Sequence, residues 1–207
     1  GSWNSFVGLY AGCANTEGSN NCFVGHHAGH YNQTGSNNSF YGDLAGYNNT
    51  ASDNSFFGKD AGFSNTSASG NSFFGKEAGK ANTTATGHSF FGYHAGLANT
   101  TGYSNSFFGY QAGLANTEGN GNSFFGYGVG AYNSTGYRNS FVGSYAGYYN
   151  TTGDANSFFG RWAGASNTTE DANSGFGAYS DTAPGISNAT AIGYRANVTQ
   201  SNSLVLG

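Results

Sequence analysis

Charged side chains are scarce in this sequence. Lys, Arg, Asp and Glu together make up 8% of the 207 residues, the formal net charge is −4, and no basic cluster occurs. A nucleic-acid-binding protein carries a basic patch or stripe, so the composition argues against this function class. No apolar run approaches the roughly 18 residues of a membrane-spanning helix, and no signal peptide or lipidation motif is recognisable.

Cysteine and proline are also rare, with two Cys and one Pro. Cys13 and Cys22 could form a disulfide that caps one end of the molecule, or they could be two small thiols at variable positions. The 36 Gly would suit a disordered tract, but 18 Phe and 15 Tyr oppose this interpretation because disordered chains lack large apolar side chains.

One motif recurs along the whole chain: Asn-Ser-Phe-Phe-Gly, three residues, Gly, two residues, Asn-Thr. Nine of the twelve intervals between its closing glycines are 17 residues, two are 16 and the last is 14. So short a period is typical of a solenoid. We predict an array of 17-residue repeats over residues 1–186, continued by a shorter 14-residue coil over 187–207. Because residue 1 falls inside a repeat and residue 207 is a repeat glycine, we expect the chain to continue at both ends. The closing glycines are residues 8, 25, 42, 58, 75, 92, 109, 126, 143, 160, 177, 193 and 207.

Seventeen residues are too few for a helical repeat but suffice for two strands of about five residues and two tight turns. The sequence therefore predicts an all-β, parallel β-solenoid of about 12 coils, with glycine at turns that need a positive φ. Asn recurs seven residues after each closing glycine, from Asn15 to Asn167. These side chains can form the turn, bond from coil to coil as a ladder, or do both.

Two adjacent residues of each repeat are apolar, and neighbouring residues of a strand point to opposite sides. We assign the residue just before the closing glycine to the interior and the Phe before that to the outside. The outward Phe residues would then form a stripe that is buried between copies of the chain. The alternative is an exposed aromatic ladder that binds a ligand. The predicted interface is Phe6, Phe23, Phe40, Phe56, Phe73, Phe90, Phe107, Phe124, Phe141 and Phe158.

The tail, with Asn188-Ala189-Thr190-Ala191-Ile192-Gly193 and Asn202-Ser203-Leu204-Val205-Leu206-Gly207, resembles the 14-residue head repeats of YadA-like trimeric autotransporter adhesins. Similar arrays occur in phage tail-fibre-like proteins. The resemblance implies a left-handed β-roll and a homotrimer, and it is most specific over residues 187–207. The longer repeats depart from it, because they place Phe where the tail has Ala191.

Motifs for catalysis or cofactor binding are weak. Residues 70–76 match the first part of a phosphate-binding loop, but Glu77 stands where Ser or Thr should hold the metal. His26, His27 and His30 could ligate a metal, but they occupy variable positions, which favours solvent-facing side chains. The acidic residues are scattered over different phases of the repeat. We therefore expect neither an enzyme nor a cofactor.

Recognition would have to use the positions that vary from coil to coil. Among these, Tyr93, Tyr110, Tyr127 and Trp162 form a candidate row for stacking on sugars or extended proteins. Random decoration of a passive spacer is the slightly favoured alternative. A column of Thr after the repeated Asn raises ice binding as a further hypothesis.

The expected function is thus an adhesive or structural head or shaft segment of an extracellular trimeric fibre on a cell or virion surface. Its partners would be two further copies of itself and a host glycan or matrix protein. The alternative is a monomeric β-solenoid that binds ice or glycans.

Overall fold

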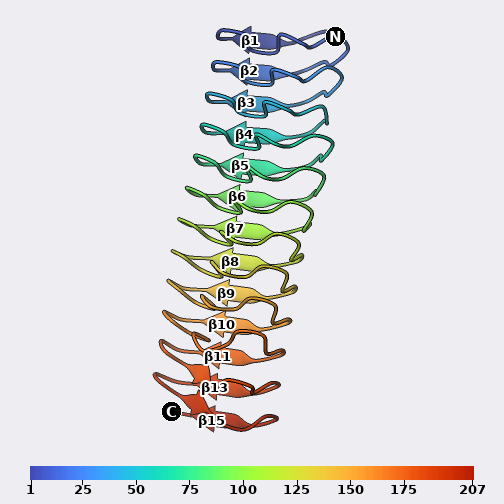
Figure 1. Ribbon diagram of the computed structural model, residues 1–207. Helices are drawn as coiled ribbons and strands as arrows, with labels where there is room; N and C mark the ends of the chain where they lie inside the picture. Colours follow the sequence, from blue (N-terminus) through green and yellow to red (C-terminus); the bar gives the residue numbers. More distant parts are fainter.

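The computed structural model describes all 207 residues and contains strands but no helix. Its main sheet has 13 parallel strands that follow one another in chain order, so successive coils stack into a rod (Figure 1). This arrangement confirms the predicted parallel β-solenoid. The strands of the main sheet are β1 (Ser5–Val7), β2 (Cys22–Val24), β3 (Ser39–Tyr41), β4 (Ser55–Phe57), β5 (Ser72–Phe74), β6 (Ser89–Phe91), β7 (Ser106–Phe108), β8 (Ser123–Phe125), β9 (Ser140–Val142), β10 (Ser157–Phe159), β11 (Ser174–Phe176), β13 (Thr190–Ile192) and β15 (Leu204–Leu206).

Each long coil contains one three-residue strand, not the two five-residue strands that the period suggested. Left-handed backbone follows the strand closely, for example at Gln111 (φ 56°) and Gly113 (φ 59°), and it turns the chain too sharply for a second strand. Coils are nevertheless bonded to one another around their perimeter. Only 25 of the 136 backbone–backbone hydrogen bonds join strand residues, so most of the backbone hydrogen bonds involve residues of the turns.

A second strand per coil forms only near the C-terminus. There β12 (Asp181–Thr182) pairs in parallel with β14 (Asn197–Val198). The main sheet meanwhile passes residue 187 without interruption, because β11 pairs with β13 and β13 with β15.

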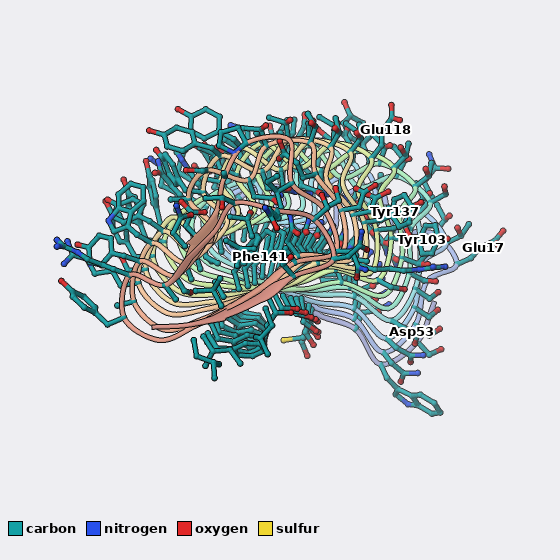
Figure 2. All side chains as sticks on the ribbon, turned by 90° about the horizontal axis from the view of Figure 1, so that it is seen from below. Glu17, Asp53, Tyr103, Glu118, Tyr137 and Phe141 are labelled. Atoms are coloured by element: carbon teal, nitrogen blue, oxygen red, sulfur yellow. The ribbon has the colours of Figure 1, made fainter.

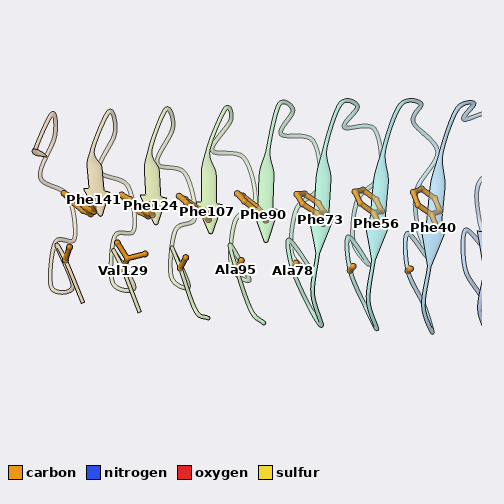
Figure 3. Close-up of a cluster of buried hydrophobic side chains, with 14 of the residues drawn as sticks. Phe40, Phe56, Phe73, Ala78, Phe90, Ala95, Phe107, Phe124, Val129 and Phe141 are labelled. Atoms are coloured by element: carbon orange, nitrogen blue, oxygen red, sulfur yellow. The ribbon is translucent and has the colours of Figure 1, made fainter. Parts of the chain in front are cut away.

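The interior of the long coils is narrow and is filled by a repeated set of side chains: one Phe, one Ala and two Asn. The Phe rings stack on their counterparts in neighbouring coils, with centroids 4.8 Å apart for Phe124 and Phe141 (Figure 3). Ala packs beside them, replaced once by Val129. The last Phe of the column is Phe158. The same position is Gly175 in β11 and Ala191 in β13, so the last coils have a smaller apolar core.

The asparagine ladder predicted from Asn15 to Asn167 is present, and its members also form the turn. Asn116 illustrates both roles: Nδ2 donates to Oδ1 of Asn99 in the preceding coil at 2.8 Å and to the carbonyl of Gly119 at 2.9 Å. The side chain is fully buried. Both amide hydrogens are therefore committed inside the rod.

A second buried ladder comes from the Asn that opens the motif, which the sequence analysis did not assign. Oδ1 of Asn122 accepts the backbone N–H of Asn139 at 2.9 Å, and its Nδ2 donates to the carbonyl of Gly136 at 2.8 Å. Its strict recurrence at the repeat period was the available signal. His88 is the single replacement between Asn4 and Asn173.

Candidate interaction surface

The prediction of which Phe column faces outward is wrong. Within each three-residue strand the middle side chain points inward, and this residue is the Phe that was expected at an interface. Phe6 alone is partly exposed, because it lies in the first coil. The other nine members of this column are 0% exposed within one chain and so cannot form an interface between chains. They are Phe23, Phe40, Phe56, Phe73, Phe90, Phe107, Phe124, Phe141 and Phe158.

Alternation along a strand separates two neighbouring residues but does not say which of them lies inside. The second glycine of the repeat decides the question. A Cβ on Gly113 would lie 2.5 Å from Cε2 of Phe107, so glycine provides the space in which the ring sits. The interior position also becomes Gly175 and Ala191 where the coil shortens, as expected for a position limited by volume.

The outward apolar column consists of the residues directly before the closing glycines, and it runs along all 13 strands of the main sheet. Its aromatic members stack along the rod, for example Phe91 on Phe108 with centroids 4.7 Å apart and planes 8° apart. Because neighbours cover the ring faces, these residues expose mainly their edges. The column is Val7, Val24, Tyr41, Phe57, Phe74, Phe91, Phe108, Phe125, Val142, Phe159, Phe176, Ile192 and Leu206.

A second outward column lies beside the apolar column, at the first residue of each strand. It is Ser in ten strands, Cys22 in β2, Thr190 in β13 and Leu204 in β15. Neither column contains a charged residue. The outward face of the main sheet is therefore a long, uncharged surface with one apolar and one mostly hydroxyl row.

The two cysteines are free, which favours the alternative of two separate thiols over a disulfide. Cys22 belongs to the outward sheet face, where its Sγ lies 3.0 Å from the hydroxyl of Tyr41. Cys13 lies in a turn with its Sγ 3.4 Å from Nδ1 of His30. The two thiols thus occupy different positions of the coil.

The three histidines of the second coil lie close together, but no group of three His, Cys, Asp or Glu residues in the chain has metal-binding geometry. His27 and His30 approach each other with their Nδ1 atoms 3.1 Å apart. His26 instead contacts Asp43 in the next coil at 3.0 Å. Partial burial, and then the neighbouring charges of His26 and His30, lower the pKa of His27.

The ion pairs of the chain lie in one small patch, in the turns that follow strands β2 to β6. Lys59 contacts Asp43 at 2.6 Å, and together with His26 it lowers the pKa of that carboxyl. One coil on, Lys80 contacts Asp60 at 3.4 Å. All three lysines of the chain lie within these coils. The exposed Lys59–Asp43 pair contributes little stability, of the order of 0–1 kcal/mol.

The candidate recognition row is brought together in part. Tyr93, Tyr110 and Tyr127 stack in succession, with centroids 5.2 and 4.9 Å apart. Trp162 lies in the adjacent column and stacks on Tyr145 at 4.5 Å. Since the tyrosine rings cover one another, they offer edges and hydroxyls to solvent rather than the open ring faces on which sugars stack.

The threonine column that raised ice binding as a hypothesis is engaged within the rod. The hydroxyl of Thr50 donates to the carbonyl of Thr66 in the next coil at 2.9 Å, and Thr151 does the same toward Thr168 at 2.9 Å. The hydroxyls therefore take part in coil-to-coil bonding. No pocket is present on the surface, so the outward sheet face and its edges are the candidate interaction surface.

Comparison of the chain with protein-family models, with curated proteins and with solved structures finds no match. A helix long and apolar enough to cross a membrane is not found in the fold.

Proposed function

We propose that this chain is a structural and adhesive segment, a head or shaft, of an extracellular homotrimeric fibre, as in a cell-surface adhesin or a phage tail fibre. The observation that carries the proposal is the outward apolar column on the 13-stranded sheet. A continuous apolar stripe of this length is rarely left in water, so it needs a cover.

A copy of the same chain is the best-fitting cover. The face is uncharged along its length and repeats at the spacing of the coils, so an identical rod presents the same row at the same heights. Cyclic symmetry places equivalent stripes around one axis parallel to the rods. The resemblance of residues 187–207 to YadA-like heads is the reason for proposing three copies in the assembly.

Substitutions in the apolar column test the association. Phe108→Asp with Phe125→Asp places charges on the outward face without touching the interior Phe column. We expect this double variant to sediment as a folded monomer near 21.3 kDa, and the unchanged chain to have three times that mass in light scattering. Thr101→Asp with Thr135→Asp is the matched control, because Glu118 already occupies the same exposed position in the coil between them. A double Phe variant that assembles like the control contradicts the proposal.

A monomeric module that binds ice or glycans is the second candidate. The regular row of serines on a flat sheet face supports it, since equally spaced hydroxyls can order water or contact sugar hydroxyls. Freezing-point depression above that of a control protein, or glycan binding by a monomer, would favour this candidate. An oligomer that shows neither effect would argue against it.

A further inference from the structure

Two exposed columns border the outward sheet face, one at each end of the strands. The upstream edge is the residue five before each closing glycine: Trp3, Asn20, Asn37, Asp53, Gly70, Gly87, Ser104, Gly121, Arg138, Ala155, Ala172, Asn188 and Asn202. The downstream edge is the residue just after it: Leu9, His26, Asp43, Lys59, Lys76, Tyr93, Tyr110, Tyr127, Ser144, Arg161, Ala178 and Tyr194.

Every residue of the upstream edge is exposed and has a positive φ, between 53° for Asn188 and 75° for Gly87. Asp53 of this edge projects beyond one end of the sheet in the view along the rod (Figure 2). The backbone therefore accepts any side chain that tolerates a left-handed conformation. Glycine is not required for space here, because a Cβ on Gly70 would meet no atom within 4 Å.

Side-chain size at the two edges is complementary within the same coil. In each of the six coils of β5 to β10, a small residue on one edge accompanies a large residue on the other. The small residue is on the upstream edge in five of these coils; in the coil of Arg138 it is on the downstream edge. In the coil of β4 the pair is Asp53 with Lys59, of opposite charge. The coils of β1 to β3, β11 and β13 do not follow the rule; the coil of β1, for example, has two large residues, Trp3 and Leu9. The six pairs are Gly70 with Lys76, Gly87 with Tyr93, Ser104 with Tyr110, Gly121 with Tyr127, Arg138 with Ser144 and Ala155 with Arg161.

The two residues of a pair cannot touch within one chain. They flank the three-residue strand on opposite sides and are six residues apart, which can reach at most roughly 20 Å in fully extended backbone. The strand between them, which rises about 3.3 Å per residue, keeps them well beyond contact distance. Size and charge can match across such a gap only if another molecule brings the edges together. The occupant that carries the same pattern at the same heights is a second copy of this chain.

We infer that copies associate side by side in register, with the upstream edge of each chain against the downstream edge of the next. This inference rests on the self-association proposed above and adds its direction and register. In a cyclic assembly around an axis parallel to the rods, equivalent coils share one height, and every interface joins two different edges. The glycines of the upstream edge then receive Tyr93 and Tyr127 of the neighbouring copy, while Ser144 leaves room for Arg138.

Cysteine cross-linking tests the pairing directly. Three variants would be oxidised and compared, all in a Cys13→Ser, Cys22→Ser background. One carries Ser104→Cys, one carries Tyr110→Cys, and one carries both. A disulfide needs Cα atoms within about 7 Å, so the two positions cannot bridge inside one chain. We expect only the chain with both cysteines to form covalent oligomers, ending at one closed size. Cross-linking by a single-cysteine variant, or none by the double variant of an oligomeric protein, overturns the inference.

A size-exchange series gives an independent readout. Gly87→Arg is expected to raise the concentration for half-assembly at least about ten-fold. Adding Tyr93→Ser recreates the Arg138–Ser144 combination and should restore assembly to within about three-fold of the original chain. Gly87→Asn is the control, because Asn20 and Asn37 adopt the same backbone. If the Gly87→Arg variant assembles normally, or if adding Tyr93→Ser does not restore assembly, the two edges do not meet. If the unsubstituted protein is monomeric, the proposed self-association itself is contradicted.

Discussion

The ring of Phe107 lies directly over the Cα of Gly113, six residues further along the same coil. A Cβ on Gly113 would be 2.5 Å from Cε2 of the ring, and the glycine also has a φ of 59°. This contact recurs in every long coil and explains why the repeat needs a second glycine. It couples the turn to the packing of the aromatic interior.

Gly113→Ala should therefore destabilise the rod for two reasons. The left-handed conformation costs an L-residue about 1–2 kcal/mol, and displacing the ring should add about 1–3 kcal/mol. Gly185→Ala is the control, since its φ is 79°, its Cβ would meet no atom within 4 Å, and it lies on neither edge of the outward sheet face. Thermal unfolding measures both. Equal losses in the two variants would show that the ring contact does not matter.

Neighbouring phenylalanines should differ sharply in what they stabilise. Phe107→Ala removes a fully buried ring, and we expect the chain to lose about 3–5 kcal/mol of folding free energy. Phe108→Ala removes an outward ring and should cost the isolated chain about 1 kcal/mol, while weakening assembly. Denaturant unfolding at low protein concentration, combined with sedimentation, separates the two effects. The opposite order would restore the original assignment of the columns.

The period alone was sufficient to predict the solenoid, because a 17-residue interval repeated along the chain allows few other solutions. The side of the sheet to which each Phe points was not predictable from alternation. Resolving it required the contact between Phe107 and Gly113, which depends on how the turn folds back over the strand. The number of strands per coil was also missed, since left-handed backbone at Gln111 is not encoded by a glycine.

The buried asparagines should contribute strongly to the folding stability of the rod. Asn116→Ala removes two donated hydrogen bonds and leaves one amide hydrogen of Asn133 without its acceptor, while the Gly119 carbonyl keeps its bond from Nδ2 of Asn105 at 2.7 Å. A lost hydrogen bond costs about 0.5–1.5 kcal/mol, and a buried donor left unpaired costs about 1–3 kcal/mol, so we expect a loss of several kcal/mol. Asn120→Ala is the comparison, because no hydrogen bond of its side chain is present. Chemical denaturation of both variants gives the difference, and similar stabilities would contradict a structural ladder.

Burial also restricts which Asn-x-Ser/Thr sequons can carry glycan. Asn65, Asn82, Asn99, Asn133, Asn150 and Asn167 are buried, with 0 or 1% of their surface exposed. Asn37, Asn188 and Asn197 also head sequons and are exposed. If the chain is secreted from a eukaryotic cell, mass spectrometry of the soluble, folded fraction should find glycan at such exposed sites and none at the six buried ones. Glycan at any of the six buried sites in folded protein would contradict the ladder.

His88 should make the rod sensitive to acid. It replaces an Asn of the second ladder: its Nδ1 accepts the backbone N–H of Asn105 at 3.2 Å, and its ring also bonds the carbonyl of Gly102. The neutral Nε2–H tautomer satisfies both contacts, whereas protonation at Nδ1 would break the first one. Burial lowers the pKa of His88 from 6.5 to about 4.

Because the unfolded chain binds this proton more readily, stability is complete above pH 6.5 and decreases as the pH falls toward 4. The full effect is about 3 kcal/mol. His88→Asn restores the ladder residue and should abolish this component, so the difference in unfolding free energy between the two proteins should grow from pH 7 to pH 4. Subtracting the variant removes the contributions of Asp43 and Glu170, whose lowered pKa values make both proteins less stable in acid. A difference that does not change with pH would show that His88 takes up no proton on unfolding in this range.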